Sequence, residues 1–169
     1  MSMRTHCGTA PKVVLLVGAL GLLLSGCLKT EEFPVEPRIT FDSFEFFGDS
    51  ASLTISFTDG DGDIGLGASD VAPPYDTASE YYYNLFLGYS EKLNGEWVDV
   101  DFEEPISYRI PRITPTGQNK ALEGEIAVAI DPFPLFITGN SDTVRYSVVL
   151  VDRALNRSNE VNTGEILVP

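Results

Sequence analysis

Three aspartates, Asp59, Asp61 and Asp63, alternate with two glycines directly after an apolar strand pattern in residues 57–67 (FTDGDGDIGLG). In an extended chain, side chains two residues apart point to the same side, about 7 Å from each other, and the glycines allow the backbone to bend and bring the carboxylates closer. At about 5 Å, each pair would repel by about 3 kcal/mol at an effective dielectric of about 20, and a bound cation would remove this cost. Calcium takes about six to eight oxygen ligands, so we predict a calcium site in this loop.

The loop resembles the calcium loops of EF-hand proteins at their first, third and fifth positions. It departs from them at the sixth position, where Ile64 replaces the glycine of the sharp turn, and at the twelfth, where Asp70 replaces glutamate. We therefore predict shared ligand chemistry and not an EF-hand. The alternative is an acidic turn without metal, because aspartate and glycine are favoured turn residues and their carboxylates can be solvated.

Two expected strands flank the residues that could complete this site. Residues 51–57 (ASLTISF) alternate apolar and polar side chains, and residues 143–151 (TVRYSVVLV) would bury by the same alternation Val144, Tyr146, Val148 and Leu150. As strands B and F of an immunoglobulin-like sandwich, both would lead into loops at one end, which would bring Asp152, Asn156 and Asn159 toward the aspartates. The alternative for Asp152 and Asn156 is a turn in which their side chains cap backbone N–H groups.

The chain after residue 38 has a strand-like pattern throughout. Residues 39–47 change the phase of their alternation near Asp42 and Ser43, which predicts a β-bulge. Asn94-Gly95 predicts a hairpin between two further strands. We expect an all-β fold, an immunoglobulin-like antiparallel β-sandwich of seven to eight strands in residues 39–169.

Aromatic residues on the outer faces of two expected strands suggest a ligand surface. In residues 81–89 (YYYNLFLGY), the odd positions form an apolar face, which leaves Tyr82 and Phe86 on the other side with Asn84. Trp97 would point to the same side as Asp99 in an expected strand whose other side buries Val98, Val100 and Phe102. These outward rings could stack on a glycan, or a neighbouring loop could cover them, since apolar surface residues are common.

Residues 1–26 are typical of a secretory signal peptide, with Arg4 and Lys12, no acidic residue, and an apolar run over residues 13–24. The following LSGC resembles the lipobox of bacterial lipoproteins, which implies lipidation of Cys27. The acyl chains would anchor the protein to a membrane. Residues 27–38 are then a lipidated cysteine and a flexible tether with two prolines.

Removal of residues 1–26 takes away His6, Cys7 and two of the 11 basic residues, and leaves 25 acidic ones, a net charge of −16. Without histidine, a Ser-His-Asp triad and a His/Cys zinc site are excluded, and with Cys27 as the single remaining cysteine, an intramolecular disulfide is excluded as well. The acidic excess argues against nucleic-acid binding. We expect no enzyme but a non-catalytic module that binds a protein or a glycan. The alternatives are a small carboxylate- or metal-dependent hydrolase and a passive spacer domain.

The chain as a whole resembles a set of uncharacterised Bacteroidota outer-membrane lipoproteins with an immunoglobulin-like domain. The resemblance rests on the F-x-D-G-D-G-D-I-G loop, the Asn-Gly hairpin, and residues 146–168 (YSVVLVDRALNRSNEVNTGEILV), which resemble the last two strands of bacterial immunoglobulin-like domains. Residues 29–32 (KTEE) also resemble the export tag that directs such lipoproteins to the outer membrane. The resemblance implies this fold and an outer-membrane location, on the surface or the periplasmic face, and no particular activity.

Overall fold

The computed structural model describes residues 32–113, 120–134 and 141–169, which belong to one compact unit, Glu32–Pro169. These residues form strands and one short helical turn. The bounds are β1 (Arg38–Phe47), β2 (Ser50–Asp59), 3-10 helix η2 (Glu80–Tyr82), β3 (Leu85–Leu93), β4 (Glu96–Asp99), β5 (Ile106–Tyr108), β6 (Leu122–Ile130), β7 (Thr143–Leu150), β8 (Val161–Asn162) and β9 (Ile166–Leu167).

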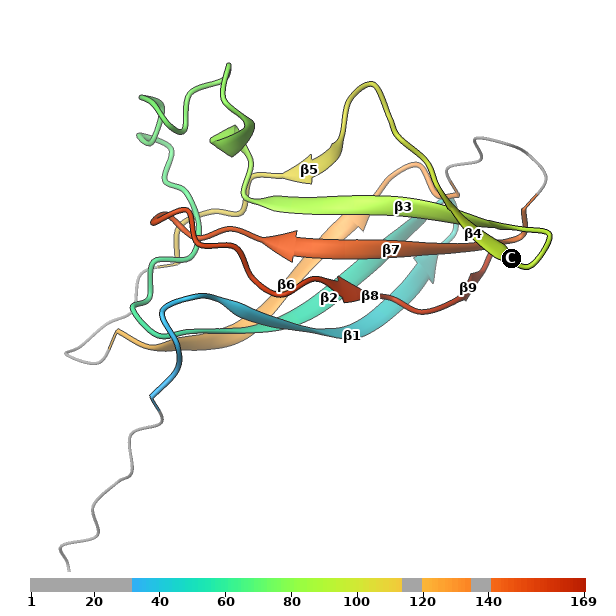
Figure 1. Ribbon diagram of the computed structural model, residues 1–169, viewed down its shortest axis with the longest axis horizontal. Coiled ribbons are helices and arrows are strands. Elements are labelled where there is room, and N and C mark those ends of the chain that lie inside the picture. The colour runs from blue at the N-terminus through green and yellow to red at the C-terminus, as the bar shows by residue number, and fades with distance from the viewer. Residues whose placement is uncertain (1–31, 114–119, 135–140) are drawn as a thin grey trace, which may run out of the picture. The chain divides into compact units, whose positions relative to one another are not determined.

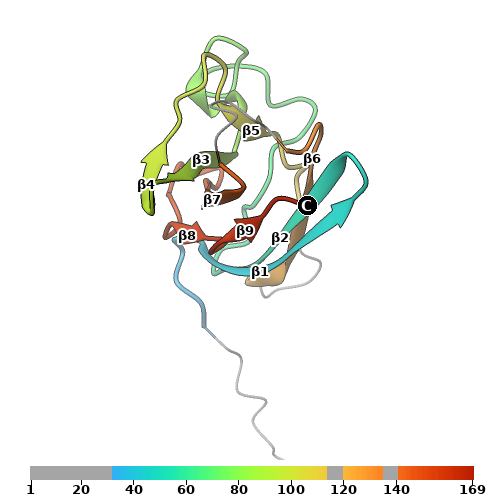
Figure 2. The ribbon, with the colours of Figure 1, turned by 90° about the vertical axis from the view of Figure 1, so that its right-hand side faces the viewer.

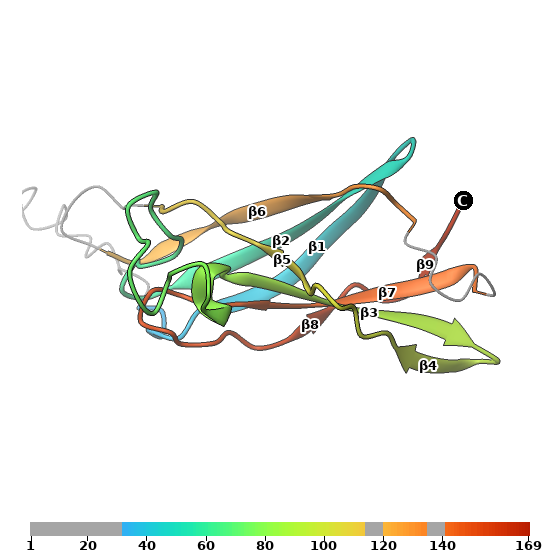
Figure 3. The same cartoon turned by 90° about the horizontal axis from the view of Figure 1, so that it is seen from above.

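The strands form two antiparallel sheets that pack face to face as a β-sandwich (Figures 1 and 2). One sheet has the order β1-β2-β6, and the other has the order β4-β3-β7-β8. In the second sheet β5 also pairs with β3, and β9 also pairs with β7. The strands of the two sheets run at a slant to each other (Figure 3), as expected from sheet twist.

The predicted all-β sandwich is therefore confirmed, and the strand order is that of an immunoglobulin-like domain, with β2 and β7 in the places of strands B and F. The described residues contain nine strands, because β8 and β9 pair one after the other with β7 and because β4 and β5 pair with successive parts of β3.

The core lies between the sheets and is built from alternate residues of the long strands, as the sequence predicted. In β2 the buried side chains are Ala51, Leu53, Ile55 and Phe57, and in β7 they are Val144, Tyr146, Val148 and Leu150. The register of β1 against β2 shifts between Phe41 and Ser43, which confirms the predicted bulge. Asn94 and Gly95 both have positive φ angles, 53° and 89°, as a tight hairpin turn requires.

Two strand predictions are wrong in part. Residues 81–84 do not continue β3. Instead Tyr81 and Tyr82 belong to η2, Tyr83 is 40% exposed, and the Asn84 side chain is buried against the backbone of Ile110. Val98 is exposed in place of the expected burial, because β4 is the edge of its sheet and extends beside only the last residues of β3.

The chain reaches β1 through contacts that begin inside the predicted tether. Pro37 is buried, and the backbone N–H of Gly60 donates to the carbonyl of Pro34 at 2.8 Å. A Cβ at Gly60 would lie 2.3 Å from the carbonyl oxygen of Phe33, so only glycine lets the two segments approach this closely. The ordered entry therefore lies beside the aspartate loop.

A substitution at Gly65 tests how tightly the loop after β2 packs against Pro111. The φ of Gly65 is +88°, and a Cβ there would lie 2.1 Å from the carbonyl oxygen of Pro111. We expect Gly65→Ala to lower the free energy of unfolding of residues 32–169 by more than about 2 kcal/mol, because it adds backbone strain and a steric clash. Urea-induced unfolding measures the change.

Gly48→Ala is the matched control. Gly48 has a similar φ of +68°, but a Cβ added there would meet no atom within 4 Å, so only the strain of about 1–2 kcal/mol applies. Equal losses in the two variants would show that the contact between Gly65 and Pro111 is not tight.

Candidate metal centre

The loop after β2 and the turn after β7 meet at one end of the sandwich, as the predicted topology requires (Figure 1). The contact is made by hydrogen bonds from the turn to Asp63. The backbone N–H of Ala154 donates to Asp63 Oδ2 at 3.0 Å, and that of Arg153 donates to the Asp63 carbonyl at 3.3 Å. Asp63 therefore links two segments that are far apart in the sequence.

Three carboxylates converge at this contact. Asp59, Asp63 and Asp152 each offer one oxygen, and these three atoms all lie within 4.8 Å of one another. Asp59 is completely buried, Asp152 is 2% exposed, and Asp63 is partly buried. Acidic side chains are seldom so deeply buried without a charged partner.

Hydrogen bonds satisfy the cluster only in part. Asp59 Oδ2 accepts from the backbone N–H of Asp63 at 2.9 Å, and both Asp152 oxygens accept from Asn156, one from its backbone and one from its side-chain amide, each at 2.8 Å. Asp59 Oδ1 and Asp63 Oδ1 are buried and have no hydrogen-bond partner among the described residues. Buried polar atoms are nearly always paired with protein, water or a ligand, so these two oxygens are candidate ligand atoms.

The electrostatics of the cluster disfavour three negative charges. Burial, together with the charges of Asp61, Asp63 and Asp152, raises the pKa of Asp59 from 3.8 to about 6, although the N–H of Asp63 opposes this. Burial and neighbouring aspartates also raise the pKa values of Asp63 and Asp152. A divalent cation would reverse this balance, because it stabilises the ionised carboxylates.

The loop that carries Asp63 is held by apolar contacts and by a change of backbone direction. β2 ends at Asp59, and Gly62 then has a φ of +69°, which turns the chain. Ile64 and Leu66 then insert into the core, where they are 0% and 4% exposed. Leu66 also forms a backbone bridge to Pro111. Asp63 therefore lies between the end of β2 and the buried residues that fix the loop in the core.

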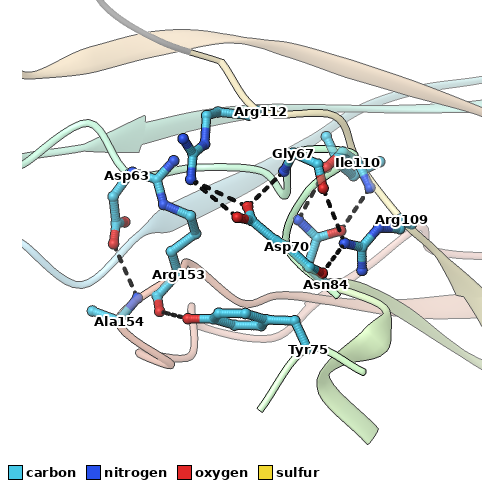
Figure 4. Close-up of polar contacts among 10 residues, drawn as sticks. All are labelled: Asp63, Gly67, Asp70, Tyr75, Asn84, Arg109, Ile110, Arg112, Arg153 and Ala154. Carbon is cyan, nitrogen blue, oxygen red and sulfur yellow. Dashed lines mark hydrogen bonds and ion pairs between the residues drawn. The ribbon is translucent and has the colours of Figure 1, made fainter. Parts of the chain in front are cut away.

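Arg109 holds the later part of the same loop. Its guanidinium donates to the carbonyls of Gly67 at 3.2 Å and Asp70 at 2.7 Å, and also to that of Tyr82. Figure 4 shows that Arg112 and the N–H of Gly67 meet the Asp70 carboxylate from different sides. The backbone N–H of Gly67 and the guanidinium of Arg112 lower the pKa of Asp70.

A further contact joins the loop to the turn after β7. The hydroxyl of Tyr75 donates to the carbonyl of Arg153 (Figure 4). Tyr75 and Asp63 therefore both hold the turn at Arg153 and Ala154, directly after Asp152. None of these loop contacts is visible in the sequence pattern.

The structure brings together three of the five predicted metal ligands. Asp61 is exposed and lies outside the group of three, although its charge raises the pKa values of the others. The Asp152 carboxylate caps the backbone N–H of Asn156 and also accepts from its side-chain amide, which is the local turn given as the alternative to ligation. Asn159 lies at β1, where its amide both accepts from and donates to the backbone of Ile39.

The three predicted aromatic ligand residues each lie against a cationic side chain. Ring centroids are 4.7 Å from Arg109 for Tyr82, 6.0 Å from Arg157 for Phe86 and 4.5 Å from Arg145 for Trp97. Trp97 pairs with Lys92 near one end of β3, whereas Phe86 lies near the other end. The rings therefore do not share one continuous platform.

The donor set fits a hard cation. Three carboxylates supply oxygen only, which suits calcium or magnesium and not the metals that prefer nitrogen or sulfur. Calcium tolerates irregular coordination better than magnesium does, and it could be held by Asp59, Asp63 and Asp152 with carbonyls and water as further ligands.

The raised pKa of Asp59 predicts how stability depends on pH without metal. Because the folded-state pKa of about 6 exceeds the ordinary 3.8, folding favours the protonated form, and this stability is present below pH about 4 and lost as the pH rises through about 6. The pKa difference corresponds to about 3 kcal/mol. Urea-induced unfolding in chelator between pH 4 and pH 8 measures it.

The Asp59→Asn variant should lose much of this pH dependence, since the asparagine carries no charge and still accepts from the N–H of Asp63. Asp63 and Asp152, whose pKa values are raised in the same direction, would supply the remainder. The same slope in the variant and the parent would contradict the role of Asp59.

Among the described residues, no helix is long and apolar enough to cross a membrane. Comparisons of the chain with family models, with curated proteins and with solved structures give no match.

Proposed function

We propose that this protein is a non-catalytic module, anchored in the bacterial outer membrane through lipid on Cys27, whose β-sandwich is stabilised by calcium and binds a protein or a glycan. The observation that supports calcium is the pair of buried, unpartnered oxygens, Asp59 Oδ1 and Asp63 Oδ1, beside Asp152. A cation there would satisfy both oxygens and neutralise the cluster.

The position of the cluster favours a structural role for the metal. It lies where the loop after β2 meets the turn after β7, so a cation would connect the two sheets through residues at and just after the ends of β2 and β7. Binding to the folded state alone stabilises that state. Calcium would thus keep this end of the domain closed.

A hydrolase is the less favoured function. Asp59 and Asp152 are almost completely buried, and a carboxylate that acts as an acid, base or nucleophile must reach the substrate. Asp61 is exposed, but it lies outside the group of three, and a carboxylate mechanism of the glycosidase kind needs a pair. A passive spacer would account for the fold but not for the unpaired oxygens.

Calcium should raise the Tm of residues 32–169 in a concentration-dependent way. At a concentration of about 100 times Kd, one site adds about 2.7 kcal/mol to the free energy of unfolding, which is a shift of several degrees for a domain of this size. Differential scanning calorimetry in chelator and then across a calcium titration measures the shift. Magnesium at equal concentrations should give a smaller shift.

Asp59→Asn and Asp61→Asn form a matched pair for this titration. Both remove one charge from the same loop, but only Asp59 belongs to the group of three. We expect Asp59→Asn to abolish the shift and Asp61→Asn to weaken calcium binding by less than about tenfold, through the loss of a nearby charge. A flat response in the parent protein would make the loop an acidic turn without a metal.

The lipid anchor is tested separately in the full chain. Expressed in a Bacteroidota host with an alkyne fatty acid, the parent should become labelled and sediment with the outer membrane, whereas Cys27→Ser should do neither, because it lacks the acceptor thiol. Cys7→Ser is the matched control and should retain the label. Labelling of Cys27→Ser would place the lipid elsewhere.

A further inference from the structure

A groove lies over β5 and the start of β3, away from the aspartate cluster. In Figure 1, η2 and the segment between β4 and β5 rise on either side of β5. One wall comes from η2 and the residues around it, and the other comes from the segment that leads into β5. Among the residues that line the groove are Glu80, Tyr83, Phe86, Glu103, Glu104 and Tyr108.

The rim of the groove is acidic. Glu80, Glu103 and Glu104 are exposed, and no ion pair within the described part of the chain involves them. The groove has no lysine or arginine among its lining residues. By contrast, Asp70, Asp99 and Glu165 each have a cationic partner. The rim therefore presents a local negative potential to a ligand.

The floor adds aromatic surface suited to cations. Tyr83 is 40% exposed and Phe86 is partly buried, and aromatic faces attract guanidinium and ammonium groups. Arg157 already lies 6.0 Å from the Phe86 ring centroid, which leaves the more exposed Tyr83 as the main aromatic surface for a partner's cation. A cationic side chain with an apolar stem would match both rim and floor.

The edge of β5 offers a place for an extended chain. β5 pairs with β3 along one edge, and no strand of residues 32–113, 120–134 or 141–169 pairs with its other edge. An unpaired strand edge can add an extended segment through backbone hydrogen bonds, while alternate side chains enter the neighbouring groove.

From the acidic rim, the aromatic floor and the open edge, we propose that this groove binds an extended, arginine- or lysine-rich segment of a partner protein. The proposal deepens the binding role proposed above, and it does not depend on the metal. A net charge of −16 after removal of residues 1–26 would accelerate the approach of such a partner.

The test uses a short fluorescein-labelled peptide of alternating arginine and threonine and the compact unit Glu32–Pro169, with fluorescence anisotropy as the readout. The parent should bind, and binding should weaken with salt. Glu103→Gln combined with Glu104→Gln should weaken binding by about three- to tenfold, since exposed charge pairs contribute modestly. Tyr83→Ala should weaken it as well, through loss of the aromatic face.

The combination of Glu123→Gln and Glu125→Gln removes the same charge from exposed positions on β6, outside the groove, and should leave binding almost unchanged. Equal losses of peptide binding in both double variants would show that only the net charge of the protein matters, and would overturn the proposal. So would the absence of peptide binding, or binding of a glucan oligosaccharide in its place. The parent should bind the peptide equally well in chelator and in calcium, so a failed calcium response and a failed groove remain distinguishable.

Discussion

The burial of three like-charged carboxylates at one point is the constraint on which this end of the molecule depends. Asp59, Asp63 and Asp152 converge within 4.8 Å, and each charge loses much of its hydration there. The N–H groups of Asp63, Ala154 and Asn156 offset part of that cost. The hydrogen bond from Ala154 also connects the loop after β2 to the turn after β7. One interaction therefore both stabilises the charge of Asp63 and holds the loop in place.

The long loop between β2 and β3 is ordered without regular secondary structure over most of its length. The side chains of Ile64 and Leu66 are buried in the core. The Arg109 guanidinium donates hydrogen bonds to the carbonyls of Gly67, Asp70 and Tyr82. Long connections of this kind are often functional. Here the loop supplies both the aspartate cluster and, through η2, one wall of the groove over β5.

The sequence predicted the sandwich and the meeting of Asp59, Asp63 and Asp152, because alternation marks half-buried strands and strand order determines which loops meet. The sequence alone did not show that Asp63 belongs to the cluster whereas Asp61 lies outside it. Regular spacing suggests a shared side, but the positive φ of Gly62 breaks the alternation. It also missed η2, since Asn84 is buried by partners on Ile110, 26 residues later, and a contact at that distance leaves no local pattern.

The entry of the chain beside the cluster determines how the domain would carry mechanical load. Pro34 is bonded to Gly60, and β1 runs from this end alongside β2 as far as Phe47. A pull on the chain before Glu32 would therefore act along β1 and stretch the hydrogen bonds of the β1–β2 ladder together, in shear. A pull from the hairpin end would instead open them one after another. An attachment at this end would therefore load the β1–β2 ladder in its mechanically stronger direction.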